Sequence, residues 1–264
     1  MSPDFQHSAN HDAARKLHQQ GTGSWFLASE QFANWKSAPA TFLWLHGIAG
    51  CGKSVLCSSI IQNVMDEYAS VDNVAVVYFY FSFQDQAKQK PEMMVRSLIW
   101  QLAKKVKPIT CTLTALFTSS HGEQPSLNAL LYVLEDMIRC FDQVYLFVDA
   151  LDECNDRKDL MDILETAINW KCSTLHALVT GRRERDIESK LESFSVGSNF
   201  VPLESDVVNP DIKSYILQRM QKDENLSRWR QDQREEIELT LTNKAHGMYA
   251  SSISCQSLHT KYTT

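Results

Sequence analysis

Residues 47–54 read Gly-Ile-Ala-Gly-Cys-Gly-Lys-Ser and match the pattern G-x-x-x-x-G-K-[ST]. In such a loop the glycines let backbone N–H groups point at phosphate oxygens, and the lysine, here Lys53, reaches the β- and γ-phosphates of a nucleotide. The hydroxyl of Ser54 is placed to ligate Mg²⁺ at a helix N-terminus, where the helix dipole favours anions. We therefore expect a phosphate chain to bind to Gly47, Ile48, Ala49, Gly50, Cys51, Gly52, Lys53 and Ser54.

A carboxylate directly follows a second apolar run, Val144-Tyr-Leu-Phe-Val148. That carboxylate is Asp149, and a Mg²⁺ ion bound to nucleotide phosphates needs such an acidic ligand. For this segment alone, a surface acidic turn would be the simpler interpretation. Beside an intact phosphate-binding loop, we expect Asp149 and Ser54 to be the protein ligands of Mg²⁺.

The residues after Asp149 bear on hydrolysis. Position 150 is alanine, whereas many hydrolysing enzymes with this loop carry glutamate directly after the aspartate. We expect Glu153 to orient the attacking water and Asp152 to support it, because both lie within about a turn of Asp149. The alternative is that one of these acids only caps the helix after Asn155, a common use of acidic residues.

An arginine follows another expected strand, in the run Thr180-Gly-Arg-Arg183. An arginine that emerges from a strand beside a nucleotide can interact with the γ-phosphate charge. Arg182 is therefore the candidate sensor of the γ-phosphate. Its structural alternative is a surface salt bridge with Glu184 or Asp186.

Alternating strands and helices must position these residues. Apolar, β-branched runs predict strands, and strands that alternate with helices imply a mostly parallel sheet covered on both faces. In such a sheet the ligand crevice lies at the carboxyl ends of the strands, where the phosphate loop also lies. We expect strands over residues 41–46, 74–81, 144–148, 175–180 and 199–203, the last weak and at an edge because of Pro202.

Capping residues predict where the helices begin. Ser24 is expected to cap a helix with Trp25, Ala28, Phe32 and Trp35 on one face, and another helix follows the phosphate loop. Two further helices are expected to begin at Pro91 and after Ser126. A third is expected after Asn209, with Asn209 as N-cap and Pro210 in the first helical position. The last is expected near residues 231–245.

The composition narrows the function further. The 264 residues carry a net charge of −6, so we expect no nucleic-acid partner. The seven cysteines are odd in number and include no C-x-x-C pair, which favours a reducing, cytoplasmic setting without disulfides or zinc. The chain begins without a signal-peptide pattern and has no apolar run near 18 residues, so we expect no membrane span.

The motifs together resemble the NACHT domain of the STAND class of P-loop NTPases, especially those of fungal receptor-like proteins. The resemblance spans roughly residues 15–250, and the pattern Asp149-Ala-Leu-Asp-Glu153 is its specific part beyond the phosphate loop. It also includes Gly21-Thr-Gly-Ser-Trp25, Tyr78-Phe-Tyr-Phe81, Arg96-Ser-Leu-Ile99, Gln101-Leu102, Asp211-Ile212, Tyr215-Ile216 and Gly247-Met-Tyr249.

The resemblance implies a three-layer α/β fold in which the fourth strand lies between the first and the third. It also implies that Arg182 is the first sensor arginine, although Gly181 replaces the usual serine. The family binds ATP or GTP with Mg²⁺, is held closed by the diphosphate, and self-associates or joins related receptor chains when exchange opens it. Its fungal members act in non-self recognition and incompatibility signalling.

The expected domains are an N-terminal helical segment and linker (1–40), a P-loop NTPase core (41–205), a partial helical domain (206–250) and a disordered tail (251–264). The family's winged-helix domain would follow the helical domain, yet a polar tail stands there. The resemblance therefore implies a truncated member of the family.

Three functions compete. The first is a nucleotide-binding switch with slow hydrolysis, and the second is a non-catalytic truncated module that associates with full-length relatives. A small-molecule kinase is a third, but no acceptor-binding lid is evident. Adenine is favoured over guanine, because Asp152 stands where GTPases carry glycine and Asn243-Lys-Ala-His246 lacks the final aspartate of N-K-x-D.

Overall fold

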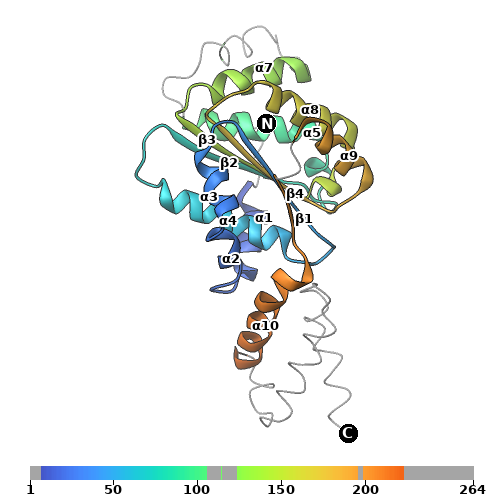
Figure 1. Ribbon diagram of the computed structural model, residues 1–264. Helices are drawn as coiled ribbons and strands as arrows, with labels where there is room; N and C mark the ends of the chain where they lie inside the picture. Colours follow the sequence, from blue (N-terminus) through green and yellow to red (C-terminus); the bar gives the residue numbers. More distant parts are fainter. Residues whose placement is uncertain (1–6, 106–113, 115–123, 196–198, 223–264) are drawn as a thin grey trace.

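The computed structural model describes residues 7–105, 114, 124–195 and 199–222. Five parallel strands form one sheet in the order β2-β3-β4-β1-β5 (Figure 1). The expected parallel sheet and the position of β4 between β1 and β3 are confirmed. The strands are β1 Thr41–His46, β2 Val74–Tyr80, β3 Gln143–Asp149, β4 Leu175–Gly181 and β5 Phe200–Pro202.

Burial of the strands explains why they are mostly apolar. Every residue of β4 is buried, and in β1 only Thr41 is not fully buried. Parallel strands covered on both faces require such continuous apolar runs, with no alternation of polar residues. β5 pairs with β1 alone, so Pro202 lies at the edge of the sheet, as its missing N–H requires.

Helices cover both faces of the sheet and complete the three layers (Figure 1). One face is covered by α1 His7–Leu17, α2 Ser24–Leu27, α3 Glu30–Ser37 and α4 Lys53–Glu67. The other is covered by α5 Pro91–Ala103, α7 Leu127–Ile138, α8 Arg157–Asn169 and α9 Arg185–Phe194. Two short 3₁₀ turns, η1 Gln86–Lys88 and η2 Leu151–Glu153, follow β2 and β3.

The single helix expected from Ser24 is wrong, because the chain forms two helices there. Ser29 ends the first by capping α3, where its Oγ accepts a hydrogen bond from the N–H of Phe32 at 3.1 Å. Ser24 does not cap α2, since its Oγ donates to the carbonyl of Gly21 at 2.8 Å. The N-cap at Ser29 thus divides the predicted helix.

The start expected for the last described helix is also wrong. Helix α10 runs from Ser205 to Lys222 and contains Pro210 in its interior. The turn has already formed before the proline, since the N–H of Val208 donates to the carbonyl of Glu204 at 3.1 Å. Asn209 therefore does not act as the cap, and its Oδ1 is buried without a hydrogen-bond partner in the described part of the chain.

The helices expected at Pro91 and after Ser126 are confirmed. The helix expected over 231–245 and the tail 251–264 lie outside the described residues. Within the described ranges, no helix is long and apolar enough to cross a membrane. Five cysteines fall in these ranges, and all five are free thiols: Cys51, Cys57, Cys140, Cys154 and Cys172.

Candidate phosphate-binding site

The phosphate loop joins the end of β1 to the start of α4. Gly50 and Gly52 have φ values of 74° and 89°, a left-handed conformation that glycine adopts readily. Gly52 is the N-cap of α4, so the loop leads directly into a helix N-terminus. The N–H of Gly47 donates to the carbonyl of Gly181 at 3.3 Å, which attaches the start of the loop to β4. The end of β4 thus holds the start of the loop in place.

A cavity of about 310 Å³ lies against this loop. From the loop, it is lined by Ala49, Gly50, Cys51, Gly52, Lys53 and Ser54. Gly47 lies at the junction with β1, and Ile48 is half exposed. The structure therefore brings the second part of the predicted loop to the cavity. Its other walls come from residues after β3, from Arg182, from the segment between α1 and α2, and from α10.

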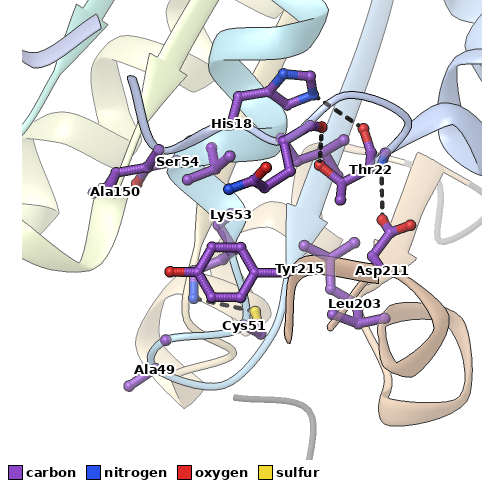
Figure 2. A pocket seen from close by; sticks show the side chains of 18 of the residues that line it. His18, Thr22, Ala49, Cys51, Lys53, Ser54, Ala150, Leu203, Asp211 and Tyr215 are labelled. Carbon is purple, nitrogen blue, oxygen red and sulfur yellow. Dashed lines mark hydrogen bonds between the residues drawn. The ribbon is translucent and has the colours of Figure 1, made fainter. Parts of the chain in front are cut away.

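The ammonium group of Lys53 lies within the loop. Its Nζ donates to the carbonyls of Gly47 and Ile48 at 3.0 and 2.8 Å, and it lies 3.8 Å from the Sγ of Cys51 (Figure 2). These carbonyls belong to the loop itself. The positive charge is thus held where the loop would surround an anion.

Asp149 is fixed by two hydroxyl groups. Ser54 Oγ donates to its Oδ2 and Thr180 Oγ1 donates to its Oδ1, each at 2.6 Å. Thr180 also accepts a hydrogen bond from the N–H of Ala150 at 3.1 Å. The structure brings Ser54 and Asp149 together, and their role as ligands of Mg²⁺ stays a prediction. Thr180 was missed, although a polar residue in a mostly apolar, buried strand was an available signal.

The electrostatics of Asp149 fit a cation site. Its side chain is buried, and this burial raises its pKa to about 6, against the opposing hydrogen bonds from Ser54 and Thr180. A bound divalent cation would favour the ionised carboxylate. The carboxylate and hydroxyl are hard oxygen ligands of the kind Mg²⁺ prefers. No group of three acidic, His or Cys side chains among the described residues is arranged to hold a metal ion. Mg²⁺ bound with a nucleotide commonly takes one or two protein ligands together with phosphate and water oxygens.

Asp152 and Arg182 form an ion pair at the cavity. The Nε of Arg182 lies 2.9 Å from Oδ2 of Asp152, and the N–H of Arg182 donates to Oδ1 at 2.9 Å. Asp152 is only 3% exposed, whereas Arg182 is largely accessible. The alternative in which Arg182 pairs with Glu184 or Asp186 is wrong, because both of these acids pair with Arg157.

Glu153 also lines the cavity, and its carboxylate is engaged. Its Oε2 accepts a hydrogen bond from the N–H of Phe83, just after β2, at 3.0 Å. Neither Asp152 nor Glu153 caps the next helix, because Asp156 accepts the capping bond in α8. Ala150 has a φ of 60°, and this left-handed turn directs the η2 residues toward the cavity.

The wall formed by α10, Leu203 and the segment before α2 was not predicted as part of the site. It includes the side chains of Trp25 and Val208. Leu203, Asp211 and Tyr215 belong to the same wall (Figure 2). The sequence marks Gly21–Trp25 and Asp211–Ile216 only as segments shared with the resembled family. Their contact joins residues far apart in the chain, which no local pattern reveals.

The strand order and the phosphate loop at the end of β1 define a P-loop NTPase domain of the α/β class. The profile of the family described as "Nephrocystin 3, N-terminal" matches residues 21–182, which is more than half of the chain. The chain therefore belongs to this family.

A curated relative supports the same assignment. The chain is 23% identical over 206 residues to the vegetative incompatibility protein HET-E-1 of Podospora anserina. The match covers 74% of this chain but only 15% of that protein, so the chain spans a small part of the relative's length. The resemblance to fungal NACHT proteins is confirmed.

Solved structures with the same fold have diverged far in sequence. The ORC1 protein of Aeropyrum pernix, solved in complex with DNA, matches with a TM-score of 0.56 and 11% identity over 95% of this chain and 60% of that chain. PCH-2 of C. elegans matches with a TM-score of 0.51 and 12% identity over 97% of this chain and 67% of that chain. At such identities the likeness shows the fold alone.

Proposed function

We propose that this domain is a Mg²⁺-dependent nucleoside-triphosphate switch that binds ATP and hydrolyses it slowly. The observation that carries the proposal is the hydrogen bond of 2.6 Å between Ser54 at the phosphate loop and the buried Asp149. It joins the loop and the acidic strand end into one oxygen-rich site beside a cavity of about 310 Å³. Pockets for small ligands begin at about this size.

Each residue has a proposed part in binding. The loop N–H groups and Lys53 bind the phosphate chain, while Ser54 and Asp149 hold Mg²⁺. When bound, the ion would supply positive charge against the phosphate oxygens. Arg182 contacts the γ-phosphate. To do so, its guanidinium group must leave Asp152 and pair with the nucleotide instead. The ion pair with Asp152 thus places the arginine near the cavity before nucleotide arrives.

Slow hydrolysis follows from the engagement of the acidic groups. Glu153 accepts a hydrogen bond from Phe83, and Asp152 is paired with Arg182. Both carboxylates beside the cavity therefore already have partners. A general base acts only when it is within hydrogen-bond reach of the water. Glu153 would therefore have to rearrange before it orients water, which favours a switch over a fast enzyme.

Replacing Glu153 by glutamine tests this role. The amide retains an acceptor for the Phe83 N–H but is not a base, so we expect ATP turnover to fall by roughly 100-fold while ATP affinity stays the same. Phosphate release under saturating ATP measures the rate. Glu165→Gln is the matched control, since Glu165 pairs with Lys190 on α8 and α9, and unchanged turnover in Glu153→Gln would refute the assignment.

A second candidate function is that of a non-catalytic binding module that associates with related chains. It applies if the hydrogen bond between Glu153 and Phe83 persists when nucleotide is bound, because Glu153 then cannot orient water. The two proposals separate on one measurement. A module predicts no ATP turnover above that of Glu153→Gln, whereas the switch predicts turnover that this substitution removes.

The base is proposed to be adenine, with GTP as the competing ligand. Nucleotide released by acid from freshly purified protein and separated by anion exchange identifies it. We expect ADP or ATP. Guanine nucleotides would overturn the base assignment, and the absence of any nucleotide together with no binding at millimolar ATP or GTP would overturn the proposed function.

The wider setting belongs to the same proposal. The P. anserina relative is a vegetative incompatibility protein, which supports non-self recognition signalling for this chain as well. We propose action in the cytoplasm, with self-association or association with related receptor chains. The division at residues 40, 205 and 250 likewise stays a prediction for the domain boundaries.

A further inference from the structure

One carboxylate joins two distant parts of the chain beside the cavity. Oδ2 of Asp211, on α10, accepts a hydrogen bond from the N–H of Gly23 at 2.6 Å, although 188 residues separate them (Figure 2). Both residues line the cavity. Burial raises the pKa of Asp211, while hydrogen bonding to Gly23 and to the Trp25 side chain lowers it. The contact is a short, charge-assisted hydrogen bond.

The segment that donates to Asp211 has a defined conformation. Gly23 has a φ of 77°, and a Cβ at this position would lie 2.7 Å from Cδ1 of Leu56 on α4. The preceding turn is closed by Thr22 Oγ1, which donates to the carbonyl of Gln19 at 2.9 Å. The Gly23 N–H therefore points at Asp211 from a fixed turn that packs on the helix after the phosphate loop.

A second contact follows the same path. Gln218 lies about two turns after Asp211 on α10, and its Nε2 donates to the carbonyl of Gln20 at 3.4 Å. Ile212 and Ile216 of this helix are buried in the core beneath. Helix α10 thus adjoins the 18–25 segment at two points, and Tyr215 lines the cavity from between them.

This wall is unsuited to phosphate. Beside the polar side chains of His18, Gln19 and Thr22, it presents apolar and aromatic side chains and the carboxylate of Asp211, which would repel an anion. The phosphate chain belongs at the loop, where Lys53 and the helix N-terminus of α4 lie. A nucleotide bound through its phosphates at the loop would then place its sugar and base against this wall.

We propose that Asp211 is a positioning residue that fastens α10 to residues 18–25 and so holds the wall that covers the nucleoside end of the ligand. This proposal rests on the proposed function. Loss of the fastening is expected to weaken ligands that have a base and sugar, and to leave ligands that consist of phosphates alone unaffected.

The test compares ATP with inorganic triphosphate on the full chain by calorimetry. In Asp211→Ala we expect ATP affinity to fall by about 10- to 100-fold and triphosphate affinity to stay within about twofold of the unsubstituted protein. Asp211→Asn keeps an oxygen acceptor for the Gly23 N–H. Its ATP affinity should therefore lie between that of Asp211→Ala and that of the unsubstituted protein. Asp186→Ala is the control, since Asp186 is an exposed acid paired with Arg157 outside the cavity lining.

The outcomes are distinct. Unchanged ATP affinity in Asp211→Ala, or an equal loss for ATP and triphosphate, would overturn the positioning role. If Asp211→Ala fails to fold, Asp211→Asn decides the matter: a selective loss for ATP supports the proposal, and equal affinities overturn it. If the unsubstituted protein binds neither ATP nor triphosphate, the proposed function itself fails, and that failure is seen before any variant is measured.

Discussion

Replacing Lys53 by alanine is expected to reduce ATP affinity by at least roughly 30-fold, since removal of one partner from a desolvated charge contact costs about 2–5 kcal/mol. The ammonium lies inside the phosphate loop, where it donates to the carbonyls of Gly47 and Ile48. No other lysine lines the cavity within the described ranges, so none would replace it. Calorimetric titration with ATP measures the loss.

The fold is expected to survive this substitution. Lys53 begins α4, its side chain is not part of either core cluster, and its acceptors are loop carbonyls. Lys190→Ala is the matched control, because Lys190 pairs with Glu165 and Asp162 away from the cavity. ATP affinity that is equal in Lys53→Ala and Lys190→Ala would contradict the assignment of the loop.

Replacing Asp149 by asparagine is expected to have two opposite effects. Mg²⁺-dependent ATP binding should be lost, because the amide is a much weaker ligand for a hard cation. The nucleotide-free protein should become more stable, because the buried carboxylate is costly to ionise. Asparagine can still accept from Thr180 and pair with Ser54, so the hydrogen bonds around it are retained.

The pH dependence of this second effect has a definite sign. The pKa of Asp149 is raised from 3.8 to about 6 in the folded state, so its contribution to stability is full below the lower value and is lost as pH rises through about 6. At pH 8 the lost stability amounts to up to about 3 kcal/mol. The gain from Asp149→Asn should therefore grow between about pH 4 and 6 and stay constant above.

Urea unfolding of the nucleotide-free proteins at pH 5 and pH 8 checks this prediction, with Asp186→Asn as an exposed control. Titration with ATP and Mg²⁺ checks the loss of binding in the same samples. An Asp149→Asn protein that is less stable than the original at pH 8, or that retains Mg²⁺-dependent binding, would show that this carboxylate is structural.

Local patterns were sufficient to predict the sheet and the first half of the site. Buried parallel strands leave continuous apolar runs, and a phosphate loop needs glycines and lysine at fixed spacing, so β1, β3 and the loop could be located from residue types alone. The neighbouring positions of Ser54 and Asp149 then followed from the rule that ligands lie at the carboxyl ends of strands.

The rest depends on contacts between distant segments or on competition between local signals. Ser29 and Ser24 both fit an N-cap by residue type. The structure places the cap at Ser29, where Phe32 packs against Phe26 and Trp35. Pro210 is typical of a first helical turn, yet Val208 and Ile212 are both buried on the core side, which extends α10 in front of it. Asp211 accepts a hydrogen bond from Gly23, which lies 188 residues away in the chain. A pattern of residues in the local sequence cannot predict such a contact.

The central claim is that the loop and Asp149 together bind a nucleoside triphosphate through Mg²⁺. Its most direct test is a calorimetric titration of the nucleotide-stripped full chain with ATP, once with Mg²⁺ and once with EDTA. We predict saturable binding of one ATP per chain with Mg²⁺ and markedly weaker binding with EDTA. Absence of binding in both titrations, or equal affinity in the two, would contradict the claim.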